Sequence, residues 1–392
     1  MKSKLMLVVC LSAALSPLSS LAQQAFGANR TVAYVYVTST PANTSASEID
    51  GYSAAANGTL TPISGSPFQE NDSALAVNGL YLFGLSRDTT NIDTLAVELN
   101  GSLRYVTSTN WAINNPNDCG SAGSLFTDRT GLNLYDLEFD GDCANNGYQS
   151  YRNKLLTGGL SYLGYANGGA GSFDGVSLPA TVLGNNRFAY TATNNGCFYF
   201  GVQGFARSAN GLLSDGNIGA TLPAPPDGYR GYIPTFAAAD PTNHVAMTLW
   251  AANPPGCGTN SQQIASFTAD NKGNLTTTNT SANMPATLVT YIQDLKVSPS
   301  GKLLAVAGQG GLQFFHFNGA NPPTAYTPLL TTDDISQMFW DNANHLFAIS
   351  QQAGTLHVFN VTPTGYSEAA GSPYTVSQPG SIAVQARTLI LP

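Results

Sequence analysis

Short apolar runs of strand-like alternation recur along the chain at a regular spacing. Seven of them lie at 32–37, 80–85, 132–137, 187–192, 244–249, 302–307 and 345–350, about 52 residues apart. Gly, Asn, Asp and Pro cluster between the runs, and these residues supply the backbone angles that tight hairpins need. A repeat of this length, built from strands and turns, predicts seven copies of one all-β unit.

The internal order of the unit is clearest at 293–317, where the segments QDLKVS, LLAVAG and LQFFHF are separated by two turns. A further turn of the Asn-Gly type, as at Asn57-Gly58, leads to a fourth strand in most units. Four antiparallel strands repeated seven times, with no helical period, predict a seven-bladed β-propeller. A β-sandwich is the alternative, which the regular period and the chain length disfavour. Segment 380–391 has an inner-strand pattern that the first unit, beginning at Thr31, lacks, so we expect it to close the ring.

Strand parity places the loops of such a propeller on two faces. In a four-stranded blade the turns between strands 1 and 2 and between strands 3 and 4 lie on one face, which we call the short-loop face. The turns between strands 2 and 3 and the links between blades lie on the opposite, long-loop face. The long segments 38–48, 86–93, 111–120, 140–147 and 251–260 fall on the long-loop face. Because rigid scaffolds present binding residues on such loops, we expect function there.

The N-terminus has the pattern of a secretory signal peptide. Lys2 and Lys4 precede the apolar run LMLVVCLSAAL, and small residues follow up to Ala22. The pattern predicts a signal peptide over 1–22, a short linker over 23–30 and the propeller over 31–392. The apolar run is too short to cross a bilayer core of about 30 Å. We therefore expect an exported monomer, periplasmic or extracellular, with no membrane span.

The number and spacing of charged residues limit the classes of molecule that the protein can be expected to bind. Charged residues make up only 10% of the 392 residues, and the formal net charge is −8. Nucleic-acid binding requires clustered Lys and Arg, whereas the arginines here are spread singly. The sequence thus excludes nucleic acid and disfavours a phosphorylated substrate.

Four cysteines follow the predicted cleavage site, and an even number in an exported chain favours disulfides. None has the C-x-x-C spacing of a zinc or redox site. Three disulfide connectivities are open, of which we prefer Cys119–Cys143 with Cys197–Cys257. The four are Cys119, Cys143, Cys197 and Cys257.

Several sequence segments resemble those of the lactonase-like, or YVTN-type, seven-bladed β-propeller family. They are YVYVTST (34–40), NGTLTPISGSPF (57–68), LKVSPSGKLLAVA (295–307) and EAAGSPY (368–374). The resemblance implies the same fold, and it implies enzymes that open sugar lactones or cyclise muconate through His, Arg and Glu near the central channel. Members often carry Pro-His before an inner strand. No inner strand predicted here has it, so the resemblance carries over no catalytic residue.

Candidate catalytic residues come from the residue types alone. An arginine can polarise a lactone carbonyl while a carboxylate activates water. The candidates are Arg87 with the adjacent Asp88, after the second strand of blade two, Arg152 in blade three, and the carboxylate Glu138. We place both arginines on the long-loop side.

Loop 136–147 offers oxygen ligands for a Ca²⁺ ion, chiefly Asp140 and Asp142, although it lacks the EF-hand pattern. No other cofactor is indicated. His244 and His345 are expected on the short-loop face, each opening a second strand. His316 and His357 differ in strand parity, so we do not expect them to share a metal.

Two functions follow from these observations. The leading hypothesis is a binding module whose long-loop face engages an envelope glycan, a small molecule or an extracytoplasmic protein. Its contacting side chains would be Trp111, Tyr148 and Trp250, which we expect to be partly exposed on one face. The alternative is a hydrolase that opens a non-phosphorylated lactone.

Overall fold

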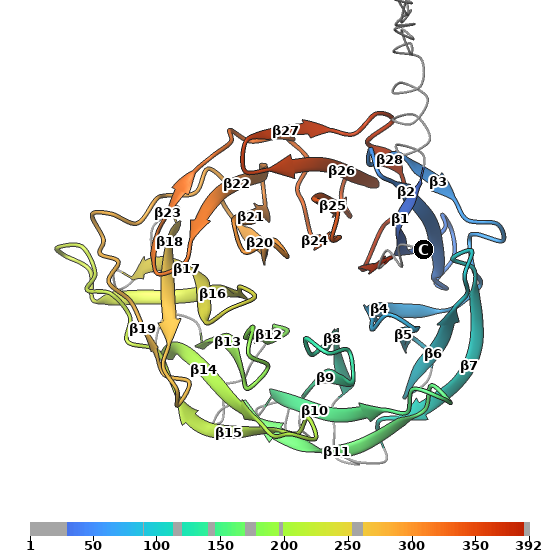
Figure 1. Ribbon diagram of the computed structural model, residues 1–392, viewed down its shortest axis with the longest axis horizontal. Coiled ribbons are helices and arrows are strands. Elements are labelled where there is room, and N and C mark those ends of the chain that lie inside the picture. Colours follow the sequence, from blue (N-terminus) through green and yellow to red (C-terminus); the bar gives the residue numbers. More distant parts are fainter. Residues whose placement is uncertain are drawn as a thin grey trace, which may run out of the picture.

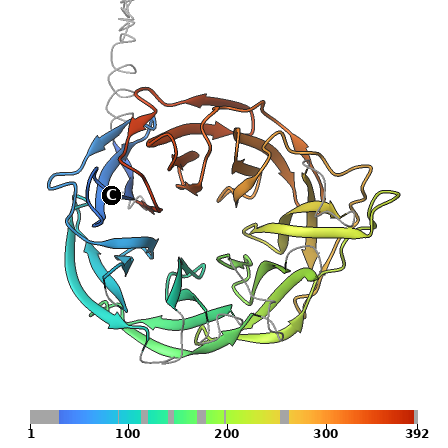
Figure 2. The ribbon, with the colours of Figure 1, turned by 180° about the vertical axis from the view of Figure 1, so that it is seen from behind.

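The computed structural model describes residues 30–88, 90–112, 120–139, 146–168, 178–195, 199–252 and 262–387. These residues form seven antiparallel sheets arranged around one axis, as Figure 1 shows, and Figure 2 shows the same ring from behind. No helix among them is long and apolar enough to cross a membrane. The prediction of an all-β, seven-bladed propeller is confirmed.

Each blade has four strands in chain order from the axis outward, except that the last strand of the chain supplies the inner strand of blade 1. Blade 1 comprises β29 (Ile382–Ala386), β1 (Thr31–Ser39), β2 (Glu48–Ala55) and β3 (Leu60–Pro62). Blade 2 comprises β4 (Asp72–Val77), β5 (Tyr81–Ser86), β6 (Asn91–Val97) and β7 (Leu103–Asn110). Blade 3 comprises β8 (Gly120–Thr127), β9 (Asn133–Phe139), β10 (Asn146–Asn153) and β11 (Leu160–Asn167).

The remaining blades follow the same order. Blade 4 comprises β12 (Thr181–Val182), β13 (Phe188–Asn195), β14 (Tyr199–Arg207) and β15 (Leu213–Ile218). Blade 5 comprises β16 (Gly231–Ala239), β17 (His244–Ala252), β18 (Gln262–Ala269) and β19 (Leu275–Thr276). Blade 6 comprises β20 (Ile292–Val297), β21 (Leu303–Gly308), β22 (Gly311–Asn318) and β23 (Asn321–Ala325). Blade 7 comprises β24 (Gln337–Trp340), β25 (His345–Ser350), β26 (Thr355–Thr362) and β27 (Gly365–Glu368), with β28 (Tyr374–Thr375) also paired to β26.

The ring closes through its C-terminal strand, as the sequence predicted. Strand β29 pairs antiparallel with β1, and Val384 lies opposite Val35. The described strand ends at Ala386, so it is shorter than the predicted segment 380–391. Closure matters because it leaves the inner edge of blade 1 paired instead of open to aggregation.

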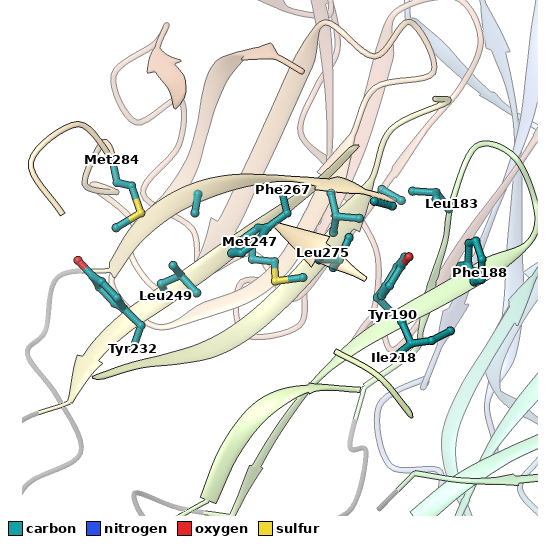
Figure 3. Packing of buried hydrophobic residues seen from close by; sticks show 14 of the residues in the cluster. Leu183, Phe188, Tyr190, Ile218, Tyr232, Met247, Leu249, Phe267, Leu275 and Met284 are labelled. Carbon is teal, nitrogen blue, oxygen red and sulfur yellow. The ribbon is translucent and has the colours of Figure 1, made fainter. Parts of the chain in front are cut away.

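Apolar side chains fill the spaces between neighbouring blades. In the cluster between blades 4 and 5, Tyr190, Met247 and Phe267 are each fully buried, and Figure 3 shows them packed together. Similar clusters occupy the other seams. A blade in the ring is therefore covered on both of its faces, so a strand can bury successive residues instead of every second one.

Buried tyrosines tie successive blades together on the short-loop face. At three seams a tyrosine of the second strand donates its hydroxyl to the carbonyl of a glycine in the next blade's outer turn. The pairs are Tyr36 with Gly101 at 2.7 Å, Tyr135 with Gly211 at 2.8 Å, and Tyr190 with Gly273 at 2.7 Å. All three glycines have positive φ, which explains the Gly of the predicted Asn-Gly type turns.

Polar side chains in the inner strands, or directly before them, bond the blades together around the axis. Each accepts a backbone N–H from the inner strand of the following blade. The contacts are Ser381 with Leu75 at 3.1 Å, Thr181 with Ala239 at 2.8 Å, Asp294 with Met338 at 2.7 Å, and Gln337 with Ile382 at 2.7 Å. These bonds satisfy inner-edge donors that no further strand can reach.

The turns between first and second strands carry an aspartate that caps them. Asp240 accepts the backbone N–H of His244 at 2.9 Å, and Asp341 accepts that of His345 at 2.9 Å. Both histidines open a second strand on the short-loop face, as expected. Their Nδ1 atoms lie 3.1 Å and 2.5 Å from the same aspartates, so both rings serve the turns.

Candidate functional site at the channel mouth

A cavity of about 410 Å³ lies where the inner strands of blades 3 to 7 end. It is lined by the last residues of β8, β12, β16, β20 and β24 and by the turns that follow them. The cavity is thus at the short-loop mouth of the central channel, not on the long-loop face where the sequence led us to expect the site. Concave sites of this size with a few fixed polar groups are suited to small ligands.

Arg129 is the most strongly oriented cation at this mouth. Its Nε donates to the carbonyl of Val182 at 2.9 Å, and its Nη2 donates to those of Ala239 and Asp240 at 2.9 and 3.0 Å. The side chain thus joins blades 3, 4 and 5. Nη1 donates to no residue of the described ranges, and Arg129 is exposed to solvent. A guanidinium held in this way presents free N–H donors in a fixed direction.

Lys296 approaches the same cavity from the inner strand of blade 6. Its Nζ lies 3.0 Å from Oδ1 of Asp294, and its side chain is 39% exposed. Asp294 also accepts the backbone N–H of Leu295 at 2.8 Å and that of Met338 at 2.7 Å. The lysine keeps contact with solvent, whereas the carboxylate is already fully engaged.

Asp128, a carboxylate of the cavity lining, is engaged as well. It is buried and forms an ion pair with Arg207, and it accepts bonds from Thr130 Oγ1 at 2.9 Å and the backbone N–H of Leu132 at 3.1 Å. A carboxylate with this many donors is a poor proton acceptor. The described part of the cavity therefore offers cations for binding an anion, but no free general base.

The structure does not bring the predicted catalytic residues together. Arg87 and Asp88 are exposed at the end of β5, where Asp88 accepts a bond from Asn71 Nδ2 at 2.5 Å. Glu138 is fully buried in β9. Arg152 lies opposite Asn133 at the start of β9, beside the turn at 154–159. That turn belongs to the short-loop face, so placing Arg152 on the long-loop side was wrong: the register puts it at the far end of β10.

The predicted aromatic surface is also corrected. Trp111 is 6% exposed and packs between blades 2 and 3, and Tyr148 is fully buried in β10. Both side chains lie in seams that neighbouring blades cover. Trp250 is half-buried and packs edge-on against the exposed Tyr291, with ring centroids 6.2 Å apart. The three side chains do not share an exposed face.

The remaining predicted sites lie outside the described residues: Asp140, Asp142 and the four cysteines Cys119, Cys143, Cys197 and Cys257. Within the described ranges no group of three His, Cys, Asp or Glu is arranged to hold a metal ion. The signal peptide over 1–22 also lies outside them.

His357 has partners that sequence reasoning missed. Its Nδ1 lies 2.9 Å from Oε1 of Glu368, and its Nε2 lies 2.9 Å from Oδ2 of Asp333. The bond from His357 holds the pKa of Asp333 below its usual value. His316 instead packs against Tyr326, with the two rings tilted by 36° and their centroids 4.3 Å apart. The two histidines are separate, in line with their different strand parity.

Arg129 and Lys296 were also missed as site residues, although both carry a signal. Each is a charged residue at or beside the end of an inner strand, where apolar and small residues dominate. What the sequence does not show is that blades 3 and 6 bring them to one cavity.

The fold and its channel define a seven-bladed β-propeller. No family profile and no curated protein matches the chain. Among solved structures, the chain is similar to a proposed 6-phosphogluconolactonase from Bacteroides uniformis, with 13% identity, a TM-score of 0.64, and 91% of this chain and 100% of that one covered. It is also similar to the periplasmic gluconolactonase of Pseudomonas aeruginosa, with 12% identity, a TM-score of 0.64, and 90% and 99% covered. A protein from Lactobacillus plantarum gives 14% identity, a TM-score of 0.64, and 91% and 99% covered. At these identities the likeness establishes the fold.

Proposed function

We propose that the protein binds a small organic anion, such as a hydroxycarboxylate, at the short-loop mouth of its channel. The observation that carries the proposal is Arg129, whose guanidinium is fixed by three carbonyls while Nη1 has no partner among the described residues. Lys296 supplies a second cation in the same cavity. A carboxylate bonded to such donors gains charge-assisted hydrogen bonds, which are about twice as strong as neutral ones.

We also propose that the protein acts outside the cytoplasm. The N-terminal pattern over 1–22 supports export, and one structural neighbour is a periplasmic protein. The long-loop face with Trp250 stays a predicted second surface for a glycan or protein, since most of its longest loops lie outside the described residues.

Replacing Lys296 with glutamine should weaken binding of D-gluconate about tenfold, because one charge-assisted contact worth roughly 1.4 kcal/mol is lost. Isothermal titration of the mature protein at pH 7 and low salt measures the change. Lys302→Gln is the matched control, since Lys302 is exposed on the same blade and outside the cavity. Equal affinity of wild type and Lys296→Gln, or no binding by wild type, contradicts the proposal.

Lactone opening is the second candidate, and the fold shared with gluconolactonases favours it. In that reaction Lys296 would donate to the developing oxyanion while water, activated by a carboxylate, attacks the ring carbonyl. Because Asp128 and Asp294 are both engaged, we expect proton release from D-glucono-δ-lactone at the rate without protein. Turnover above that rate that falls at least tenfold in Lys296→Gln would instead establish a hydrolase at this cavity.

A further inference from the structure

Asp72, the first residue of β4, is a buried carboxylate without a hydrogen-bond partner. Its residue exposure is 0%, and neither carboxylate oxygen bonds to a described residue. The side chain lies over Gly84 of β5, where an added Cβ would stand 1.9 Å from Oδ2. The glycine thus provides the space that the carboxylate fills. Buried carboxylates are ordinarily paired, so this one requires an explanation.

The groups that act on Asp72 electrostatically are themselves acidic. Asp93 of β6 lies opposite Gly84, and Glu70 precedes β4 in the link from blade 1. Burial, followed by the charges of Asp93 and Glu70, raises the pKa of Asp72 to about 7. Burial likewise raises the pKa values of Glu70 and Asp93.

Other charged groups at this end of the seam have different partners. Asp88 accepts a bond from Asn71, and Glu48 accepts one from Gln69 at 3.0 Å. Arg87 points toward blade 1, with Nη2 4.0 Å from the place of a Cβ on Gly380. No ion pair links Arg87 to Asp72 within the described ranges, and no metal-binding group of three occurs there. A neutral, protonated carboxyl is the form that this environment favours.

Asp72 also lies at a contact that holds blade 1 against blade 2. Its backbone carbonyl accepts the hydroxyl of Ser47 at 2.7 Å. The neighbouring Asn71 accepts the backbone N–H of Ser47 at 2.7 Å, and its own carbonyl accepts the N–H of Arg87 at 2.9 Å. Ser47 belongs to the long loop of the blade that β29 closes. A negative charge on Asp72 would therefore lie next to the hydrogen bonds that join blades 1 and 2, beside the blade that β29 closes.

We propose that Asp72 is a proton-operated switch: its neutral carboxyl keeps the seam between blades 1 and 2 closed, and its ionisation loosens that seam. When the seam opens, water reaches the carboxyl and its pKa returns toward the ordinary value of about 4. The closed form binds a proton that the open form releases, so acid favours closure. Opening should increase about eightfold from pH 5 to pH 6, about fivefold from pH 6 to pH 7, and level off above about 7.

Hydrogen exchange with mass spectrometry tests the proposal on the full mature protein. Peptides covering 40–47 and 63–86 are followed at pH 5, 6, 7 and 8, and the rates are corrected for intrinsic exchange. In wild type the opening equilibrium should rise about fiftyfold between pH 5 and pH 7. In Asp72→Asn, which keeps the shape of the neutral acid, most of this rise should disappear, leaving only the smaller pH dependence that Glu70 and Asp93 contribute. Asp227→Asn, at an exposed position, should behave as wild type.

A second variant keeps the test independent of how well Asp72→Asn folds. Asp93→Asn removes the larger of the two charges that act on Asp72, so the pH at which opening levels off should move downward. A wild-type seam whose opening does not depend on pH overturns the proposal. So does a rise of wild-type size that persists in Asp72→Asn, or a levelling-off pH that is the same in Asp93→Asn as in wild type.

Discussion

Replacing Arg207 with methionine should lower the free energy of unfolding by about 3–5 kcal/mol, because Asp128 then stays buried without its charge partner. The two side chains are 8% and 0% exposed. Arg207 also donates to Asn133 Oδ1 at 2.7 Å and to the Tyr135 hydroxyl at 3.1 Å. The guanidinium therefore holds blades 3 and 4 together at one seam.

Urea unfolding of the mature protein, followed by tryptophan fluorescence, measures this loss. Arg104→Met is the control, since Arg104 pairs with Glu98 at 2.8 Å but is 64% exposed and should contribute less than about 1 kcal/mol. A similar loss in the two variants would show that the buried pair is no more important than the surface pair. The double variant Arg207→Met with Asp128→Asn should recover part of the stability, because it removes the stranded charge.

Replacing Gly184 with alanine should cost about 3 kcal/mol and disturb the channel mouth. An added Cβ would stand 2.0 Å from the backbone carbonyl of Pro241 and 2.4 Å from the backbone nitrogen of Thr242. Backbone atoms cannot rotate away as a flexible side chain can, so the turns of blades 4 and 5 must separate. Arg129 bonds to carbonyls on both of these blades, so binding at the mouth should weaken as well.

Thermal unfolding and D-gluconate titration measure the two effects of this change. Gly219→Ala is the matched control, because a Cβ there meets nothing within 4 Å and its φ is not positive. A Gly184→Ala variant with the stability of Gly219→Ala would mean that the blades tolerate a wider seam than the structure indicates.

The architecture was predictable from the sequence because it depends on local sequence patterns. Alternating strands, capped turns such as that of Asp341 and the glycine turns repeat in nearly every blade. The closing strand followed from a surplus inner-strand pattern at the C-terminus. Such features depend on residues close together in the chain, so one sequence contains them.

The site was less predictable because it depends on distances between blades. Arg129 and Lys296 come from blades 3 and 6, and no periodicity indicates that they meet at one mouth. The exposure expected of Trp111 and Tyr148 failed for a related reason. A propeller covers both faces of each blade, so an aromatic residue near a long loop can point into a seam.

The partner of a charge was likewise invisible in the sequence. From the sequence, Asp128 is expected only to cap a turn, yet in the structure it forms an ion pair with Arg207 of the next blade. Asp72 reads as the start of an ordinary inner strand, and only the fold shows that Asp93 faces it across a glycine.

A crystal structure of the mature protein grown with D-gluconate tests the central claim most directly. The account predicts the carboxylate at the short-loop mouth, within hydrogen-bond distance of Arg129 Nη1 and beside Lys296. Gluconate bound on the long-loop face, or an empty mouth at a ligand concentration that saturates titration, would contradict it.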